Sequence, residues 1–319
     1  MDLARGPRAM LRTTRKVEMT SKLRIGFVGI GNMGNPMAAN LIKANLGVMV
    51  YDISQDNVRK LADAHAVPVA ATLTELGTHS DVVITMLPDG QIVRRVVMGN
   101  AAGDDCLLRG LATGSTVIDM SSSAPIGTRR LGDDLRPHGI SLLDAPVSGG
   151  VKGAVAGTLA IMVGGDRELA ERLDGILAPM GRRFQVGALG SGHAAKVLNN
   201  YVSAAGLVAA AEAVLIAQRF GIEPQVLLNV INASTGRNNS TENKFAQFIL
   251  NEQFNSGFAL GLMAKDLALA MEVADGCGVQ AELGQSTLAL WKKAETMLGG
   301  GADHTEIARY INAGKKAPA

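Results

Sequence analysis

The sequence is poor in several features on which whole classes of protein depend. It holds only two cysteines in 319 residues, Cys106 and Cys277, which lie far apart and form no C-x-x-C pair. This usage excludes a disulfide framework, gives no support for a zinc site and indicates a reducing compartment, so we expect a cytoplasmic protein. Aromatic residues make up only 3% of the chain, which argues against aromatic recognition platforms.

Charge of one sign and long apolar runs are also lacking. The net charge is +2, and no run of Lys and Arg is interleaved with aromatics, so we predict no nucleic acid partner. The uncharged stretch 197–211 is shorter than a membrane span, and we interpret it as a buried interdomain helix with no membrane partner. No metal is predicted, because metal-ligand spacing is absent among His65, His79, His138, His193 and His304.

The first 22 residues are basic but have no apolar core of the kind found in a secretory signal. Met19 stands just before the first strand pattern. We therefore interpret residues 1–22 as a disordered extension or the product of a start codon placed too early, with a transit peptide as the alternative.

From residue 23 onward, short apolar runs alternate with amphipathic stretches, as in strands followed by crossover helices. This pattern predicts an α/β fold whose N-terminal domain is a Rossmann-type, doubly wound parallel sheet. The expected strands are 23–30, 48–52, 81–86, 116–119, 141–144, 159–163 and 184–186.

After Gly192 the strand pattern stops, and the remaining chain predicts an all-helical C-terminal domain. Glycines cluster just before this change, so we place the dinucleotide-binding domain at 23–189 and the helical domain, for substrate binding and oligomerisation, at 190–319. The expected helices are 193–220, 224–232, 241–250, 258–276, 283–297 and 305–312.

A G-x-G-x-x-G motif lies between the first strand and the first helix, the context in which it predicts dinucleotide binding. Gly29 permits a tight turn, Gly31 lets the backbone approach a pyrophosphate, and Gly34 allows close helix packing. The helix N-terminus supplies N–H donors. The expected cofactor-binding turn is therefore Gly29, Ile30, Gly31, Asn32, Met33 and Gly34.

Asp52 ends the second strand, where this fold places an acid against the adenosine ribose hydroxyls. A 2′-phosphate would meet that carboxylate as a like charge, and no Arg follows directly, so the sequence favours NAD over NADP. The alternative is an Asp that only caps the next helix.

Ser148, Gly149 and Gly150 follow a strand, at the edge of the sheet where such folds bind ligands. Adjacent glycines expose N–H groups, so this turn can hold a small carboxylate with help from the Ser148 hydroxyl. A purely structural turn is the alternative.

Lys196, Asn199 and Asn200 share one face at the start of the long helix. Burial and the positive end of the helix dipole would disfavour the ammonium form of Lys196 and suit it to acid and base chemistry. A solvated surface lysine is the alternative. We interpret His193 as polar surface at the helix start, and Lys265 with Asp266 as either functional or an ordinary salt-bridged helix start.

With these motifs in order, the chain from about Leu23 to Asn312 resembles the β-hydroxyacid dehydrogenase family. The resemblance rests on the segments 26–41, 144–150 and 190–200, on Asp119-Met-Ser-Ser and on Lys265-Asp-Leu. Four or more separated motifs in the same order are far more specific than one.

The resemblance implies that Lys196 is the catalytic lysine, that Asn200 assists it, and that Ser148 to Gly150 hold the substrate carboxylate. It implies further that Lys265 approaches the cofactor, and that Leu87, Pro88 and Ser122 line the nicotinamide site. A homodimer or homotetramer is also implied.

Taken together, the sequence predicts NAD-dependent oxidation of a small 3-hydroxy carboxylate to its semialdehyde, or the reverse reduction, as in 3-hydroxyisobutyrate dehydrogenases. The alternatives are a tartronate semialdehyde (2-hydroxy-3-oxopropionate) reductase, another semialdehyde reductase, an imine reductase, or a catalytically silent dinucleotide-binding protein. Lys196 argues against the last two.

Overall fold

The structure is a computed structural model that describes residues 23–313. The predictions made for residues 1–22 therefore lie outside the described residues. The chain divides into two compact units between Lys196 and Val197, inside helix α10 (Ser191–Phe220). The boundary expected between residues 189 and 190, just before this helix, remains a prediction.

The first unit is built on an eight-stranded sheet with the order β2-β1-β3-β4-β5-β7-β6 and with β8 beside β7. The first five strands in this order, β2, β1, β3, β4 and β5, are all parallel. The chain reverses its direction of travel across the sheet between β1 and β3, which is the position where folds of this kind bind ligands. The strands are β1 (Ile25–Val28), β2 (Val48–Tyr51), β3 (Val82–Thr85), β4 (Thr116–Asp119), β5 (Ser141–Asp144), β6 (Val147–Ser148), β7 (Leu159–Gly164) and β8 (Gly181–Gly187).

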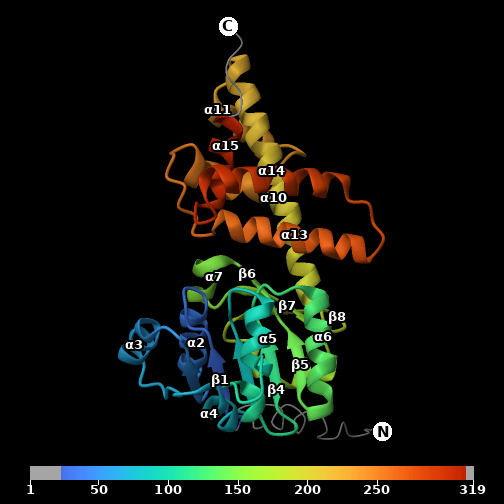
Figure 1. Cartoon of the computed structure of the whole chain (residues 1–319). Coiled ribbons are helices and arrows are strands. Elements are labelled where there is room, and N and C mark those ends of the chain that lie inside the picture. The colour runs from blue at the N-terminus through green and yellow to red at the C-terminus, as the bar shows by residue number, and fades with distance from the viewer. Residues whose placement is uncertain (1–22, 314–319) are drawn as a thin grey trace, which may run out of the picture. The chain divides into compact units, whose positions relative to one another are not determined.

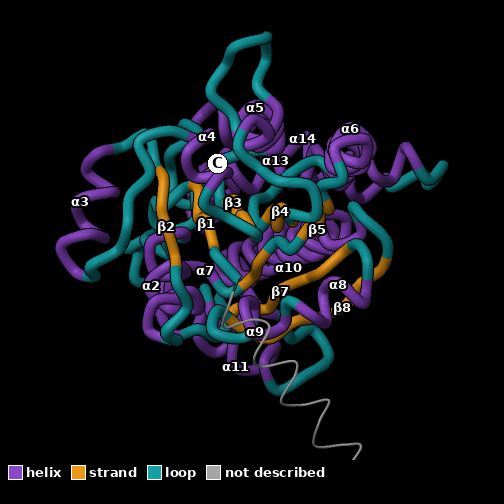
Figure 2. The backbone as a smooth tube through the Cα atoms, turned by 90° about the horizontal axis from the view of Figure 1, so that it is seen from below, coloured by secondary structure: helices purple, strands orange, loops and turns teal. Residues whose placement is uncertain are grey.

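Helices cover both faces of this sheet, with α4, α5 and α6 on one side and α2, α8 and α9 on the other (Figure 2). Successive strand residues point to opposite faces, so Phe27 packs into the core under α2 while Val28 packs into the core under α4 and α5. The helices are α2 (Gly34–Lys43), α3 (Gln55–Ala64), α4 (Leu73–Thr78), α5 (Gly90–Met98), α6 (Pro125–Leu135), α7 (Gly150–Ala156), α8 (Arg167–Arg172) and α9 (Asp174–Leu177).

The far end of the sheet departs from the expected parallel arrangement. β7 pairs antiparallel with β5 and with the short strand β6, which the sequence analysis did not anticipate. β8 starts at Gly181, three residues before the expected strand at 184–186, and its residues alternate between partly buried and exposed. Arg182 and Arg183 follow Gly181 in this strand, and a search for apolar runs overlooks them.

The second unit is helical in all its described elements, shown in yellow to red in Figure 1. Its core joins Leu207 of α10 to Phe245, Leu267, Trp291 and Ile307. The elements are α11 (Pro224–Asn232), α12 (Asn239–Asn243), the π-helical turn η3 (Phe245–Ile249), α13 (Leu260–Gly276), α14 (Glu282–Leu298), the 3-10 turn η4 (His304–Glu306) and α15 (Ile307–Ala313).

The single helix expected at 241–250 is wrong. Asn238 caps a shorter helix, α12, through a capping box with Thr241, and that helix ends at Asn243. A π-helical turn follows and buries Phe245 and Ile249. The helical periodicity of apolar residues in this stretch is present, but it belongs to two helical segments with different hydrogen-bond registers.

Helix α10 is, among the described residues, the one helix long and apolar enough to cross a membrane by length and composition, a weak criterion that core helices of soluble proteins also pass. Within the second unit it buries Leu207, Ala211 and Val214 in the core.

Candidate active site

The glycine turn between β1 and α2 has the geometry that its spacing predicts. Gly29 adopts a φ of +90°, and a side chain there would collide with the carbonyl of Met86. A side chain at Gly34 would collide with the carbonyl of Gly29. A Cβ at Gly31, in contrast, would meet nothing nearer than Asn57 Nδ2 at 4.0 Å.

The chain's own packing therefore accounts for Gly29 and Gly34 but not for Gly31. The missing side chain at Gly31 leaves open space in front of the start of α2, where no side chain caps the helix. A pyrophosphate fits this cradle, because it needs both close backbone approach and N–H donors. Ile30 is buried, Met33 is partly buried and Asn32 is exposed.

Asp52 lies at the end of β2 and is tied to this turn. Its Oδ2 accepts a hydrogen bond from the Ile30 N–H at 2.8 Å, and its Oδ1 accepts one from the Ser54 N–H at 2.7 Å. The cap of helix α3 is Ser54, whose hydroxyl accepts from the Asn57 N–H. Asp52 is therefore not the cap of the following helix.

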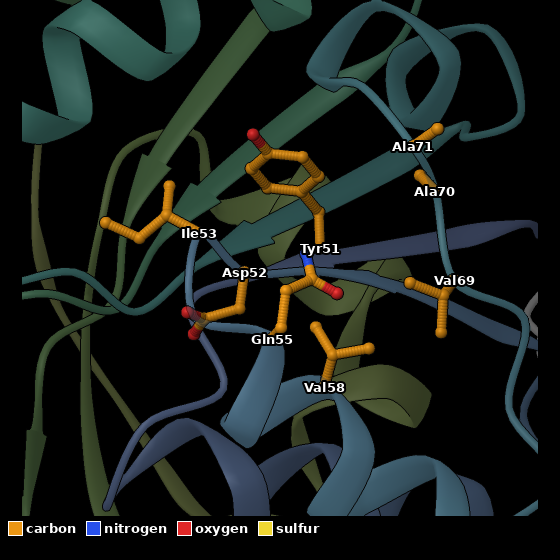
Figure 3. A pocket seen from close by; sticks show the side chains of 8 residues that line it. All are labelled: Tyr51, Asp52, Ile53, Gln55, Val58, Val69, Ala70 and Ala71. Atoms are coloured by element: carbon orange, nitrogen blue, oxygen red, sulfur yellow. The ribbon is translucent and has the colours of Figure 1, made fainter.

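A cavity of about 600 Å³ opens beside Asp52 (Figure 3). Its volume suits a nucleoside, within the ~300–1,000 Å³ usual for small-molecule sites. Burial, together with the nearby charges of Asp105 and Asp52, raises the pKa of the Tyr51 phenol. The lining residues are Tyr51, Asp52, Ile53, Gln55, Val58, Val69, Ala70 and Ala71.

The segments after β3 and β4 are joined by a hydrogen bond from the Leu87 N–H to Ser121 Oγ, at 2.9 Å. Leu87 and Ser122 are partly buried, whereas Pro88 is exposed. The structure thus brings together the two segments expected to line one end of the cofactor.

Ser148 ends β6, and the glycines after it begin helix α7. Gly149 and Gly150 have φ values of +133° and +60°, and a Cβ at Gly150 would meet nothing within 4 Å. Both glycines are exposed and Ser148 is partly buried. The turn can therefore present N–H groups to a ligand, as the sequence analysis expects.

Lys196 lies in the second turn of α10 with only 9% of its surface exposed. The alternative of a solvated surface lysine is wrong. His193, expected at the polar surface, is completely buried, and that expectation is wrong too. The reason is that its backbone and its ring both bond to the sheet's carboxyl end, at Asp144 and Ser121.

In the second unit, Asn200 and Lys265 are brought together through Asp266. Asn200 Nδ2 donates to Asp266 Oδ2 at 2.6 Å, and both residues are buried. Lys265 Nζ lies 3.6 Å from Asp266 Oδ1. Because α13 begins at Leu260, this pair lies in its second turn and is not at the helix start.

The sequence analysis assigned no function to Asp119 or Asp144 and left the role of Asp266 open, although all three are buried. Asp119 and Asp144 each end an apolar strand, and an acid at that position is a signal that could have been used. Among residues 23–313, no group of three or more His, Cys, Asp or Glu side chains is placed to hold a metal ion.

Comparisons with known proteins identify the families that the two parts of the chain match. Residues 24–190 match the family model of the NAD binding domain of 6-phosphogluconate dehydrogenase. Residues 190–311 match the family model described as NAD-binding of NADP-dependent 3-hydroxyisobutyrate dehydrogenase. The two matches meet at residue 190, next to the start of α10.

Individual relatives cover most of the chain. The NAD-dependent L-serine dehydrogenase of Pseudomonas aeruginosa is 38% identical over 84% of this chain and 91% of its own. The 3-sulfolactaldehyde reductase of Escherichia coli is 32% identical over 90% and 95%. The structure of Mycobacterium tuberculosis 3-hydroxyisobutyrate dehydrogenase with L-serine has a TM-score of 0.82 and 36% identity, covering 91% of this chain and 99% of that one.

Proposed function

Because the chain belongs to the β-hydroxyacid dehydrogenase family, which includes the 3-hydroxyisobutyrate dehydrogenases, we propose that it interconverts a small 3-hydroxy carboxylate and its semialdehyde with NAD. As a member of that family it is an NAD(P)-dependent dehydrogenase acting on a CH–OH group. The observation that carries the finer proposal is the buried Lys196 on α10, in a unit whose glycine turn leaves room for a dinucleotide.

Lys196 is the proposed acid and base. A nicotinamide dinucleotide held at the glycine turn and Asp52 would supply the hydride acceptor when the hydroxy acid is oxidised. In this direction neutral Lys196 accepts the hydroxyl proton, and in reduction its ammonium returns that proton to the carbonyl oxygen. A buried lysine suits this duty because burial disfavours its charged form.

Asn200 is the proposed assistant, one helical turn after Lys196 on α10. Asp266 holds one of its amide N–H groups, which fixes how the amide is turned. The other N–H and the oxygen of the Asn200 amide are proposed to orient the lysine or the reacting oxygen. Lys265, in contact with Asp266, is proposed to approach the cofactor.

The turn Ser148 to Gly150 is the proposed site for the substrate carboxylate. Its support is the pair of exposed glycines with positive φ, which can point N–H groups outward next to the Ser148 hydroxyl. The named substrates of relatives include serine and 3-hydroxyisobutyrate, and both are small 3-hydroxy acids.

NAD is the proposed cofactor in preference to NADP. Asp52 has a carboxylate fixed by two backbone N–H groups, and it lines the cavity proposed for adenosine. It can accept from ribose hydroxyls but repels a 2′-phosphate. The neighbouring Ile53 offers no positive charge in compensation.

We further propose a cytoplasmic homodimer or homotetramer. In the second unit, α10 leaves three large apolar side chains exposed, Val202 (69%), Ile216 (64%) and Phe220 (83%). Contact with another copy would remove this surface from water. Sedimentation of the wild type and of Phe220→Glu tests this, since we expect the variant to shift toward smaller species.

The substrate proposal is tested by initial rates on a panel of hydroxy acids and semialdehydes with both nicotinamide cofactors. The panel holds 3-hydroxyisobutyrate, L-serine, tartronate semialdehyde, succinate semialdehyde and 3-sulfolactaldehyde. We expect the highest kcat/KM for 3-hydroxyisobutyrate with NAD. A higher value for tartronate or sulfolactaldehyde reduction favours the reductase alternative, and binding of NAD without any turnover favours a silent dinucleotide-binding protein.

A further inference from the structure

A buried polar network at the carboxyl ends of β4 and β5 has no part in the proposed chemistry so far. Its centre is His193, in the first turn of α10, with no exposed surface. The His193 N–H donates to Asp144 Oδ2 at 2.7 Å, and the Gly190 N–H donates to Asp144 Oδ1 at 2.8 Å. The Asp144 carboxylate thus holds the start of α10 against the end of β5, where it also complements the helix dipole.

The imidazole ring of His193 makes a second connection, to the segment after β4. Its Nε2 lies 3.1 Å from the Ser121 carbonyl oxygen, and its Nδ1 lies 2.8 Å from Thr128 Oγ1. A carbonyl oxygen only accepts hydrogen bonds, so the Nε2 position carries a proton and donates it. The ring is therefore held at both nitrogens, and its orientation is fixed.

Ser121 passes this connection on to the segment after β3. Its hydroxyl oxygen accepts from the Leu87 N–H, and its own N–H donates to Asp119 Oδ1 at 3.0 Å. Asp119 is fixed in turn by the hydroxyls of Thr85 and Ser123. Two hydrogen bonds, through one serine, therefore link the first turn of α10 to the backbone of Leu87.

The proposed reaction places several segments of the first unit near the nicotinamide. These hydrogen bonds connect all of them. Leu87 and Ser122 are the proposed lining of that ring, Asp144 begins the segment that leads to Ser148, and Lys196 follows His193 by one helical turn. We propose that His193 is a positioning residue, which holds the lysine-bearing start of α10 at a fixed place relative to the segments 87–88 and 121–122. This inference rests on the proposed function.

The proposal predicts different behaviour for three substitutions. The amide nitrogen of Gln can reach the place of imidazole Nε2, so His193→Gln keeps the bond to Ser121. The shorter amide in His193→Asn reaches only the place of Nδ1, and His193→Leu keeps neither bond. His304→Gln is the matched control, because His304 is also a buried, hydrogen-bonded histidine but lies in the second unit.

The first measurement is the rate with the best substrate of the panel and with the same substrate deuterated at the carbon that loses hydride. We expect His193→Leu and His193→Asn to lower kcat about tenfold or more and to raise the isotope effect on kcat, because misplacement slows the hydride step. His193→Gln should keep most of the wild-type kcat. His304→Gln should leave the isotope effect unchanged.

The second measurement needs no turnover. The affinities for NADH and for ADP-ribose, which lacks the nicotinamide, are compared in each variant, together with hydrogen exchange at the Leu87 amide. In His193→Leu we expect weaker NADH binding, unchanged ADP-ribose binding and faster exchange at Leu87. This arm decides the positioning role even if the wild type turns over none of the panel, an outcome that contradicts the proposed function.

The positioning role is overturned if His193→Leu retains the wild-type isotope effect, the wild-type ratio of NADH to ADP-ribose affinity and the wild-type exchange rate at Leu87. The positioning role is also overturned if kcat falls equally in His193→Gln and His193→Leu and the fall matches the loss of folded protein in each.

Discussion

Asp52 connects the local structure of the glycine turn with the proposed choice of cofactor. Its two oxygens accept hydrogen bonds from the N–H groups of Ile30 and Ser54. The carboxylate therefore connects the glycine turn to the end of β2. These bonds also keep the negative charge in place beside the cavity in Figure 3. The proposed preference for NAD therefore rests on a residue that is also hydrogen-bonded to the glycine turn.

This account predicts how cofactor preference changes at that position. Asp52→Asn should narrow the preference for NAD, since the repulsion of a 2′-phosphate is removed. Adding Ile53→Arg should narrow it further or reverse it, because a guanidinium there can pair with the phosphate in bidentate fashion. The measurement is the ratio of kcat/KM for the two cofactors in wild type and both variants. A wild type that already prefers NADP contradicts the assigned role of Asp52.

Ser148 gives a second prediction at the residue scale. Ser148→Ala should raise KM for the hydroxy acid severalfold while leaving the affinity for NAD unchanged, because one hydrogen bond to the carboxylate, worth about 1 kcal/mol, is lost. Ser141→Ala, at an exposed position of β5, is the matched control. An unchanged KM places the substrate carboxylate elsewhere. Substitution of Gly149 would be less informative, because its φ of +133° makes any side chain strained.

At the scale of elements, the sequence predicted the strands that are buried on both faces. β4 and β5 have the expected bounds, and β1 and β3 lie inside the expected ranges. A short continuous apolar run between polar turns is compatible with few structures other than a buried strand. The strands β6, β7 and β8, at the far end of the sheet, were harder to predict. A two-residue strand such as β6 has no periodicity, and the antiparallel pairing of β7 depends on contacts distant in sequence.

Helix α10 illustrates the same division for the site. The spacing of Lys196 and Asn200 placed them on one helical face, and the resemblance assigned their roles. The burial of His193 was not predictable from its neighbours, because it depends on Asp144 and Ser121, which lie 49 and 72 residues away in sequence. A polar residue before an apolar helix looks the same in sequence whether solvent or a carboxylate faces it.

At the scale of the whole molecule, the partly buried Lys244 is expected to make stability depend on pH. Burial lowers the pKa of Lys244 from 10.5 to about 8, against the attraction of Asp303. Its Nζ also contacts Ser203 Oγ at 3.2 Å. Between pH 8 and 10.5 the Lys244 side chain therefore binds more protons in the unfolded chain than in the folded chain, so its contribution to the free energy of unfolding rises with pH.

Lys244→Met should remove that contribution. The stability of the wild type relative to Lys244→Met should increase between about pH 7.5 and pH 10.5, by roughly 3 kcal/mol at most. Urea unfolding of both proteins across this range measures the difference, and Lys292→Met, at an exposed position of α14, is the control. Parallel curves for wild type and Lys244→Met would show that the lysine is not desolvated.

The central claim is the proposal that Lys196 accepts and returns the substrate proton, and single-turnover hydride transfer from a 3-hydroxy acid to NAD tests it most directly. The rate is measured in the wild type, in Lys196→Ala and in the exposed-lysine control Lys292→Ala, with NAD affinity determined in parallel. The account predicts that Lys196→Ala lowers the rate about a hundredfold or more at nearly unchanged NAD affinity, and that Lys292→Ala changes neither. Near-normal hydride transfer in Lys196→Ala would contradict it.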